Sequence, residues 1–208
     1  MQVIIFGATG SLGTYVVKEA LAKDYSVKAF TRNATKLKEI ESPKLSIIQG
    51  DVFNFEDVQS AIKGTDAVLC CLGDGAKGTV RAKGTQNIIK AMEHLGVTRL
   101  ICQTTLGIGD SWHNLNFFWK YIMFGFLIKK AFNDHKLQEG YINETNLDFT
   151  IVRPSAFTNE PSTQNFQVGF NAQTRNLRLK ISRADVACFM VEQLSSDMFI
   201  KKTISISN

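Results

Sequence analysis

Proline, tryptophan and paired cysteine motifs are scarce in this chain. Its 208 residues contain three prolines and two tryptophans, and the four cysteines show no C-x-x-C spacing. Because no proline- or glycine-rich linker divides the chain, we expect one domain over residues 1–208. No histidine, cysteine and carboxylate cluster has metal-ligand spacing, so we expect no metal. Cysteines on apolar strand patterns, such as Cys70 and Cys71, indicate reduced thiols in a cytoplasmic protein.

Long apolar runs and a concentrated basic face are also missing. The run Tyr121–Ile128 is much shorter than the roughly 20 apolar residues that cross a bilayer. An apolar strand pattern at the very start of the chain leaves no room for a signal peptide, which again favours a cytoplasmic location. The formal net charge is +5, but lysine and arginine are scattered, so we expect no nucleic acid partner.

A glycine-rich segment stands near the start, between the apolar run Val3–Phe6 and a helical pattern at 15–22. The start of a helix offers free backbone N–H groups and a positive dipole to an anion. In such a turn the first glycine permits the tight bend, the second lets a pyrophosphate approach, and the third lets helix and strand pack closely. The spacing G-x-x-G-x-x-G therefore predicts a dinucleotide site. Its expected contacts are Gly7, Thr9, Gly10, Ser11, Leu12 and Gly13.

Strand and helix patterns alternate through the rest of the chain. Further strands are expected at 27–31, 45–49, 66–72, 99–103 and 147–152, and helices at 34–40, 55–62, 80–95 and 183–194. Ser182 is the expected N-cap of the last helix. Alternating strands and helices indicate βαβ units and a parallel sheet covered on both faces. We therefore expect an α/β fold, a doubly wound Rossmann-type sheet in a single domain.

The residue after the second strand selects the cofactor. Folds of this type that prefer NAD place an acidic residue there, bonded to the ribose 2′-OH. This chain has Arg32 instead, which can hold a 2′-phosphate with help from Lys36. The sequence therefore predicts NADP(H).

Two further strand ends complete the expected cofactor contacts. The third strand is followed by Asp51 and Val52, which would address the adenine edge. The fourth ends in Leu72 and Gly73, where a small residue would let the chain pass the adenosine ribose.

Two stretches break the alternation and are the expected walls of a substrate site. Residues 112–132 form an aromatic-rich insertion, and residues 155–177 form a polar, substrate-side loop. Both follow strands at the edge where open α/β sheets bind ligands. Three interpretations of the aromatic segment remain open: a lid over a planar substrate, a helix packed on the sheet edge, or a surface that docks on a membrane or a partner, flanked by Lys120, Lys129 and Lys130.

The motifs together resemble the atypical short-chain dehydrogenase/reductase families with an NAD(P)H-binding domain. The resemblance rests on G-A-T-G-S-L-G, on T-R-N, G-D-V and L-G after the next three strands, on 146–154 (similar to LDxTIVRPG) and on 181–187 (similar to ISRxDVA). Length and motif order most resemble biliverdin reductase B, the NADPH-dependent flavin reductase family. The resemblance covers nearly the whole chain except 112–132.

This resemblance implies further site residues. Thr104 and Thr105 stand where the family has a Thr-Ser pair beside the nicotinamide, so both are expected near that ring, with Thr105 a catalytic candidate. Pro154, Ser155 and Phe157 are expected cofactor contacts, and Ser155 replaces a histidine of the family.

The Y-x-x-x-K pair of alcohol and ketone reductases is missing. Counted back from Arg153 through Glu139, its positions hold Ala131 and His135. His135 is therefore the second catalytic candidate. Without a tyrosine acid, carbonyl reduction loses the roughly 10²–10⁴-fold of positioned proton transfer.

The sequence thus favours hydride transfer from NADPH to a flavin, quinone or tetrapyrrole, which can take its proton from water. A flavin would be substrate rather than tightly bound cofactor, and a monomer is expected. The alternative is a non-catalytic NADP(H)-sensing or assembly protein that docks through 112–132.

Overall fold

A computed structural model describes residues 1–175 and 177–208. Its central layer is an eight-stranded sheet in the order β3-β2-β1-β4-β5-β6-β10-β8. All neighbouring strands are parallel except β8, which runs antiparallel to β10. The strands are β1 (Gln2–Phe6), β2 (Ser26–Thr31), β3 (Leu45–Gln49), β4 (Ala67–Cys70), β5 (Arg99–Gln103), β6 (Asp148–Pro154), β8 (Gln167–Val168) and β10 (Lys202–Ser207).

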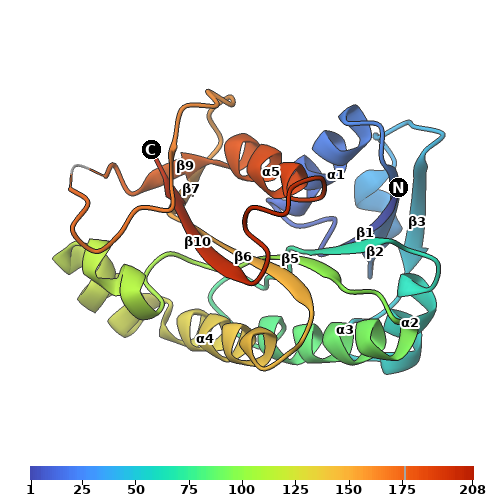
Figure 1. Ribbon diagram of the computed structural model, residues 1–208, viewed down its shortest axis with the longest axis horizontal. Helices are drawn as coiled ribbons and strands as arrows, with labels where there is room; N and C mark the ends of the chain where they lie inside the picture. The colour runs from blue at the N-terminus through green and yellow to red at the C-terminus, as the bar shows by residue number, and fades with distance from the viewer. Residues whose placement is uncertain (176) are drawn as a thin grey trace.

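Helices cover both faces of this sheet, as Figure 1 shows. One face carries α1 (Gly13–Ala22) and α5 (Arg183–Glu192), and the other carries α2 (Phe55–Ile62), α3 (Arg81–Leu95) and α4 (Lys129–Asn143). The remaining elements are short: η1 (Ala34–Leu37), η2 (Gly109–Asn114), η3 (Phe118–Leu127), and the parallel pair β7 (Ala156–Thr158) and β9 (Lys180–Ser182). Across 1–175 and 177–208, no helix has both the length and the apolar character needed to span a bilayer.

Strand β1 shows why an uninterrupted apolar run forms the middle of this fold. Successive side chains of a strand point to opposite faces. Val3 and Ile5 accordingly join the core under α1 and α5, while Ile4 and Phe6 join the core over α2, α3 and α4. Because both faces are covered, every one of these residues is apolar and buried.

The expected α/β fold, a doubly wound Rossmann-type sheet with helices on both faces, is confirmed. Two details differ. The helix expected at 34–40 is only the single turn η1, capped by the Asn33 side chain and followed by Pro43, which disfavours helix in the residue before it. The sheet is not wholly parallel, because β8 adds an antiparallel edge beside the unexpected strand β10.

Candidate cofactor and substrate site

The turn between β1 and α1 requires its glycines. Gly7 has a φ of +77°, and a Cβ there would overlap the backbone of Cys71. A Cβ on Gly13 would overlap the carbonyl of Gly7, and one on Gly10 would lie 3.1 Å from that same oxygen. The backbone therefore folds back on itself so tightly that side chains are excluded at Gly7 and Gly13, and a Cβ on Gly10 would be crowded.

The start of α1 is left open to an external acceptor. Its N-cap residue, Leu12, makes no side-chain cap, and its first turn has no acidic residue. By contrast, α2 is capped by Asn54 and α5 by Ser182, and both have acidic residues in the first turn. The N–H groups of Thr14 and Tyr15 already donate to the carbonyls of Gly10 and Leu12. The N–H groups of Ser11, Leu12 and Gly13 make no such bond among the described residues, so these groups, at the positive dipole end, are available to an anion.

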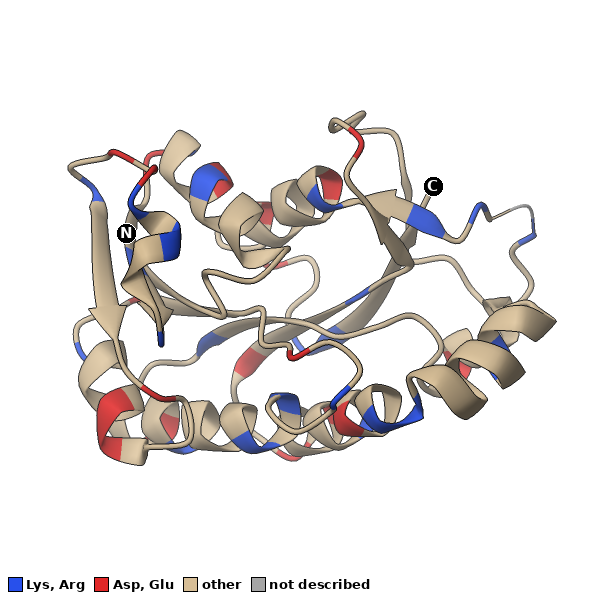
Figure 2. Ribbon diagram, turned by 180° about the vertical axis from the view of Figure 1, so that it is seen from behind, with Lys and Arg blue, Asp and Glu red and all other residues tan. Residues whose placement is uncertain are grey.

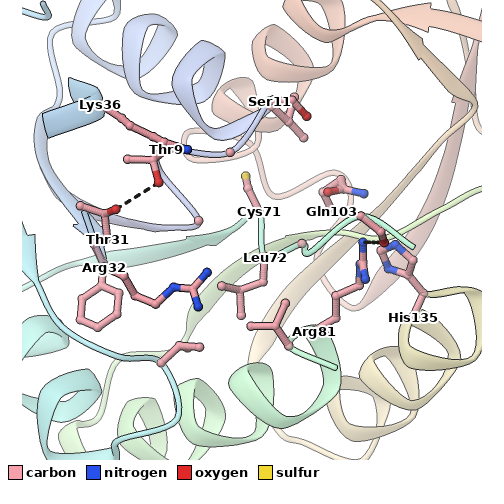
Figure 3. Close-up of a pocket in the computed structure, with 18 of the residues that line it drawn as sticks. Thr9, Ser11, Thr31, Arg32, Lys36, Cys71, Leu72, Arg81, Gln103 and His135 are labelled. Carbon is pink, nitrogen blue, oxygen red and sulfur yellow. Dashed lines mark hydrogen bonds between the residues drawn. The ribbon is translucent and has the colours of Figure 1, made fainter. Parts of the chain in front are cut away.

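The first cavity lies at this turn and along the carboxyl ends of β1, β2 and β4, with a volume of about 480 Å³. No Asp or Glu lines it among the described residues, although it contains three cationic side chains. Figure 3 shows its labelled residues converging from both sides of the sheet edge. The expected contacts that line it are Gly7, Thr9, Gly10, Ser11, Leu12, Arg32, Lys36, Val52, Leu72, Gly73 and Phe157.

Arg32 and Lys36 form the basic end of the first cavity. Arg32 makes no ion pair with any carboxylate in the described part of the chain, and Figure 3 shows its guanidinium directed into the cavity. Lys36 also lines this cavity. The hydroxyl of Thr9 is 3.0 Å from that of Thr31, which joins the glycine turn to the end of β2. Two uncompensated cations thus stand where a 2′-phosphate is expected.

Two predicted cofactor contacts, Asp51 and Gly13, line neither this cavity nor the second cavity described below. Asp51 is turned into its own loop: its carboxylate accepts the Phe53 N–H at 3.0 Å, and its N–H donates to Asp57 at 2.9 Å. Its neighbours Gly50 and Val52 line the cavity instead. Gly13 lies beneath the turn, where it permits the close approach to Gly7 rather than contact with a ligand.

The structure adds Arg81, which sequence patterns did not single out. Its guanidinium pairs with Asp74 at 2.8 Å and donates to the Gly75 carbonyl at 3.1 Å. Asp134 of α4 accepts the backbone N–H groups of Arg81 and Ala82, both at 3.0 Å, and so caps α3. This arrangement holds three parts together at one wall of the cavity: helix α3, helix α4 and the loop that follows β4.

A second cavity, of about 350 Å³, adjoins the first at the carboxyl ends of β5 and β6. The two share Gln103, His135 and Phe157. Most of the second lining is apolar, as is typical of sites for small organic ligands. Thr104, Thr105, Pro154 and Ser155, expected as nicotinamide-side residues, line this second cavity and not the first.

The polar groups of the second cavity differ in how fully they are engaged. Thr104 donates a hydrogen bond to Glu139 at 2.6 Å. Arg153 donates two hydrogen bonds to the same carboxylate, at 2.9 and 2.6 Å. Thr105 donates to the Leu106 carbonyl at 3.3 Å. The buried hydroxyl of Ser155, however, has no partner among the described residues. Ser155 is therefore the better donor for a ligand here.

His135 forms part of the wall between the cavities and is 8% exposed. Burial, with the nearby charge of Arg81, lowers the pKa of the His135 ring to about 3. Its Nδ1 lies 3.2 Å from Oε1 of Gln138, an acceptor only, so Nδ1 carries the hydrogen and Nε2 is an acceptor. Ala131, at the other position of the missing catalytic pair, is buried. Near neutral pH the described lining of the second cavity therefore offers a neutral imidazole and no tyrosine or lysine acid.

The aromatic segment 112–132 has two distinct faces. Its inner face lines the second cavity with Leu115, Trp119, Phe124 and Ile128, and Phe124 stacks on Phe132 with ring centroids 4.3 Å apart. Its outer face leaves six large apolar side chains exposed. These are Phe117, Phe118, Tyr121, Ile122, Phe126 and Leu127.

In the loop 155–177, Ser155, Ala156 and Phe157 also line the cavity, while residue 176 lies outside the described residues.

Residues 7–197 match the model of a protein family described as NAD(P)H-binding. The chain belongs to the NAD(P)H-binding family. Among curated relatives, the UPF0659 protein YMR090W of Saccharomyces cerevisiae is 27% identical over 222 residues, covering 100% of this chain and 93% of the relative. The photosystem II assembly factor Ycf39 of Synechocystis is 23% identical over 219 residues, covering 98% and 61%.

Solved structures share the fold of this NAD(P)H-binding protein. ChuY, an anaerobillin reductase from Escherichia coli O157:H7, has a TM-score of 0.81 and 24% identity, covering 99% of this chain and 96% of its own. A short-chain dehydrogenase/reductase from Veillonella parvula, in complex with NADP, has a TM-score of 0.84 and 17% identity, covering 100% and 94%. The family assignment identifies NAD(P)H as the ligand class of the chain. Its placement in the first cavity and the expected resemblance to biliverdin reductase B stay proposals.

Proposed function

We propose that this protein is an NADPH-dependent reductase that passes hydride to a planar conjugated acceptor, with a flavin as the leading candidate. The observation that carries the proposal is the pair of adjoining cavities. One has the glycine turn and cationic end suited to a dinucleotide, and the other is apolar and walled by aromatic rings. Gln103, His135 and Phe157 lie between them, so a nicotinamide there would face the second cavity.

The first cavity fits NADPH in its shape and charge. The three glycines of the turn have no Cβ that would obstruct a pyrophosphate, and the uncapped start of α1 supplies N–H groups. Arg32 and Lys36 would hold the 2′-phosphate, which supports NADPH over NADH. The shared lining residues Gln103, His135 and Phe157 would hold the nicotinamide end.

Bound NADPH supplies the hydride, and the chain supplies position. Leu115, Trp119 and Phe124 would hold a flat acceptor against the nicotinamide and exclude water from its face. His135 remains neutral because burial lowers its pKa, so it orients groups by hydrogen bonding and adds no charge. The acceptor's proton then comes from solvent, which suits flavins, quinones and linear tetrapyrroles better than simple ketones.

The test is NADPH oxidation in the presence of FMN, FAD, riboflavin and simple quinones, with an aliphatic ketone as control. We expect turnover with planar acceptors and none with the ketone. Tight NADPH binding without turnover on any planar acceptor would contradict the reductase and favour an NADP(H)-sensing protein. The similarity in fold to ChuY, an anaerobillin reductase, supports the proposal. The cytoplasmic location and monomeric state stay predictions.

A second role is favoured by the outer face of the aromatic segment. Phe117 and Phe126 are 70% and 80% exposed. No acidic residue occurs between Asp110 and Asp134, while Lys129 and Lys130 are exposed at the start of α4. Figure 2 shows η3 almost free of charged residues, with blue at the start of α4. An apolar helix face flanked by lysines suits the surface of an anionic lipid bilayer, and we propose this surface as its partner.

A further inference from the structure

Arg183 is the one charged side chain in the lining of the second cavity among the described residues, because His135 is neutral there. It is the first residue of α5 and lies half-buried beside the shared residue Phe157. Its guanidinium carbon is 5.0 Å from the centroid of the Phe157 ring. A cation in an otherwise apolar cavity is costly unless something balances it.

Neutral groups hold this guanidinium. Nη1 donates to the Thr158 carbonyl at 3.2 Å and to Oδ1 of Asn159 at 2.7 Å. No carboxylate pairs with Arg183 in the described part of the chain, and Nε is buried without a partner. The side chain is therefore fixed in place while its charge stays unbalanced.

Asp185, the acidic residue closest to Arg183 along the chain, is engaged elsewhere. Its carboxylate accepts hydrogen bonds from the hydroxyls of Ser162 at 2.6 Å and Ser182 at 2.8 Å, and from the N–H groups of Thr163 and Gln164. Burial alone would raise the pKa of Asp185, but these hydrogen bonds lower it, so the carboxylate is ionised and already satisfied. It gives Arg183 no direct partner.

We propose that Arg183 forms an oxyanion subsite of the second cavity, so the acceptor carries a phosphate or carboxylate beside its planar ring system. Nη1 is held in place and Nε is buried, which leaves Nη2, unbonded among the described residues, to donate to an oxygen of the anion in a charge-assisted hydrogen bond. The unpartnered hydroxyl of Ser155 is a further donor on the same lining. This inference rests on the proposed reductase function and names its substrate class.

FMN and riboflavin test the subsite, since they share the ring system and differ by one phosphate. For Arg183→Gln, we expect the ratio of kcat/KM for FMN to that for riboflavin to fall by about 10- to 100-fold, the range for losing a hydrogen bond to a charged group. Arg178→Gln, which removes an exposed arginine outside the cavity lining, should leave the ratio unchanged. Biliverdin and its dimethyl ester repeat the comparison for a carboxylate source.

Binding measured alongside turnover separates this inference from the reductase proposal. Flavin fluorescence gives FMN and riboflavin affinities for the protein saturated with NADP⁺. If FMN binds tighter than riboflavin through Arg183 but is not reduced, the oxyanion subsite is supported and the reductase proposal is contradicted. Equal losses for both flavins, absence of any preference for the anionic acceptors, or a matching loss of NADPH affinity in Arg183→Gln would overturn the subsite.

Discussion

The arginines of this protein fall into two electrostatic settings, paired with a carboxylate or unpaired, and the two settings imply different roles. Arg153 is balanced by Glu139 and Asp110 and fastens β6 to α4. Arg81 is balanced by Asp74 and stabilises the cavity wall. Arg32 has no carboxylate partner among the described residues. A balanced arginine stabilises the fold, whereas one without a counter-charge is available to an anionic ligand.

Replacing Arg32 by alanine should weaken NADPH binding by about 1.5–3 kcal/mol, the range for a hydrogen bond to a charged group. Affinity for NADH should change little, because NADH has no 2′-phosphate. Titration calorimetry with both cofactors measures the difference. Unchanged NADPH affinity would show that the 2′-phosphate lies elsewhere.

Removing Glu139 should destabilise the fold. Glu139→Ala leaves buried Arg153 with the exposed Asp110 alone and deprives Thr104 of its acceptor. Breaking a buried ion pair costs about 3–5 kcal/mol of unfolding free energy, which urea denaturation will measure. Glu144→Ala, at the exposed end of the same helix, is the matched control and should change stability by less than about 0.5 kcal/mol. Equal effects would refute the structural role of the pair.

At the scale of elements, η3 contacts two different surroundings, the second cavity on one side and solvent on the other. Trp119 and Phe124 point to the second cavity, and Phe117 and Phe126 point to solvent. The sequence left a lid and a docking surface as separate alternatives, but the two faces of one helix can satisfy both. Function at the inner face can therefore be altered without touching the outer one.

The double substitution Phe117→Ser and Phe126→Ser should weaken binding to vesicles of phosphatidylglycerol and phosphatidylcholine by at least about tenfold, because it removes two exposed rings from the apolar face. Added salt should weaken binding further, and vesicles of phosphatidylcholine alone should bind poorly. Vesicle flotation is the measurement, and Met198→Ser, an exposed apolar site elsewhere, is the control. Equal flotation of the double variant, or self-association abolished by it, would reject the lipid surface.

Sequence patterns succeeded where burial is apolar and failed where it is polar. Strands β1 to β5 and the glycine turn follow from apolar runs and glycine spacing alone. Helix α4 gives no such pattern because its buried face includes Asp134, His135, Gln138 and Glu139. Asp134, Gln138 and Glu139 can be buried because partners distant in sequence satisfy them, while His135 pairs with Gln138 on the same helix.

Strand β10 and the arginines needed contacts that only the folded chain provides. The stretch Thr203–Ser207 alternates polar and apolar residues, and pairing with β6 is what defines it as a parallel strand. Arg32 could be predicted because it directly follows a strand end. The roles of Arg81 and Arg183 could not, because their settings are made by Asp74, Asp134 and Phe157 in three dimensions.

At the scale of the whole molecule, one buried imidazole links stability to pH. An unfolded histidine has a pKa near 6.5, and burial lowers the pKa of His135 to about 3 in the folded protein. Between these values the unfolded chain binds more protons than the folded one. The free energy of unfolding therefore decreases as pH falls below about 6.5, by up to about 1.4 kcal/mol per pH unit from this group.

His135→Gln should flatten this pH dependence, because glutamine keeps a hydrogen-bonding side chain but cannot take up a proton. Urea denaturation between about pH 5 and pH 6.5 should show a slope smaller by up to one proton than in the unmodified protein. His94→Gln, at an exposed position, should leave the slope as it was. Identical slopes in all three proteins would mean that His135 is accessible to protons when folded.

The wall shared by the two cavities also constrains the order of kinetic events. Gln103, His135 and Phe157 contact both spaces, so a nicotinamide between them would complete one side of the second cavity. The binding surface for the acceptor is then complete only after the dinucleotide has bound, and both ligands must be bound together for hydride transfer. Turnover should accordingly pass through a ternary complex, with double-reciprocal plots that intersect instead of running parallel as in a ping-pong cycle.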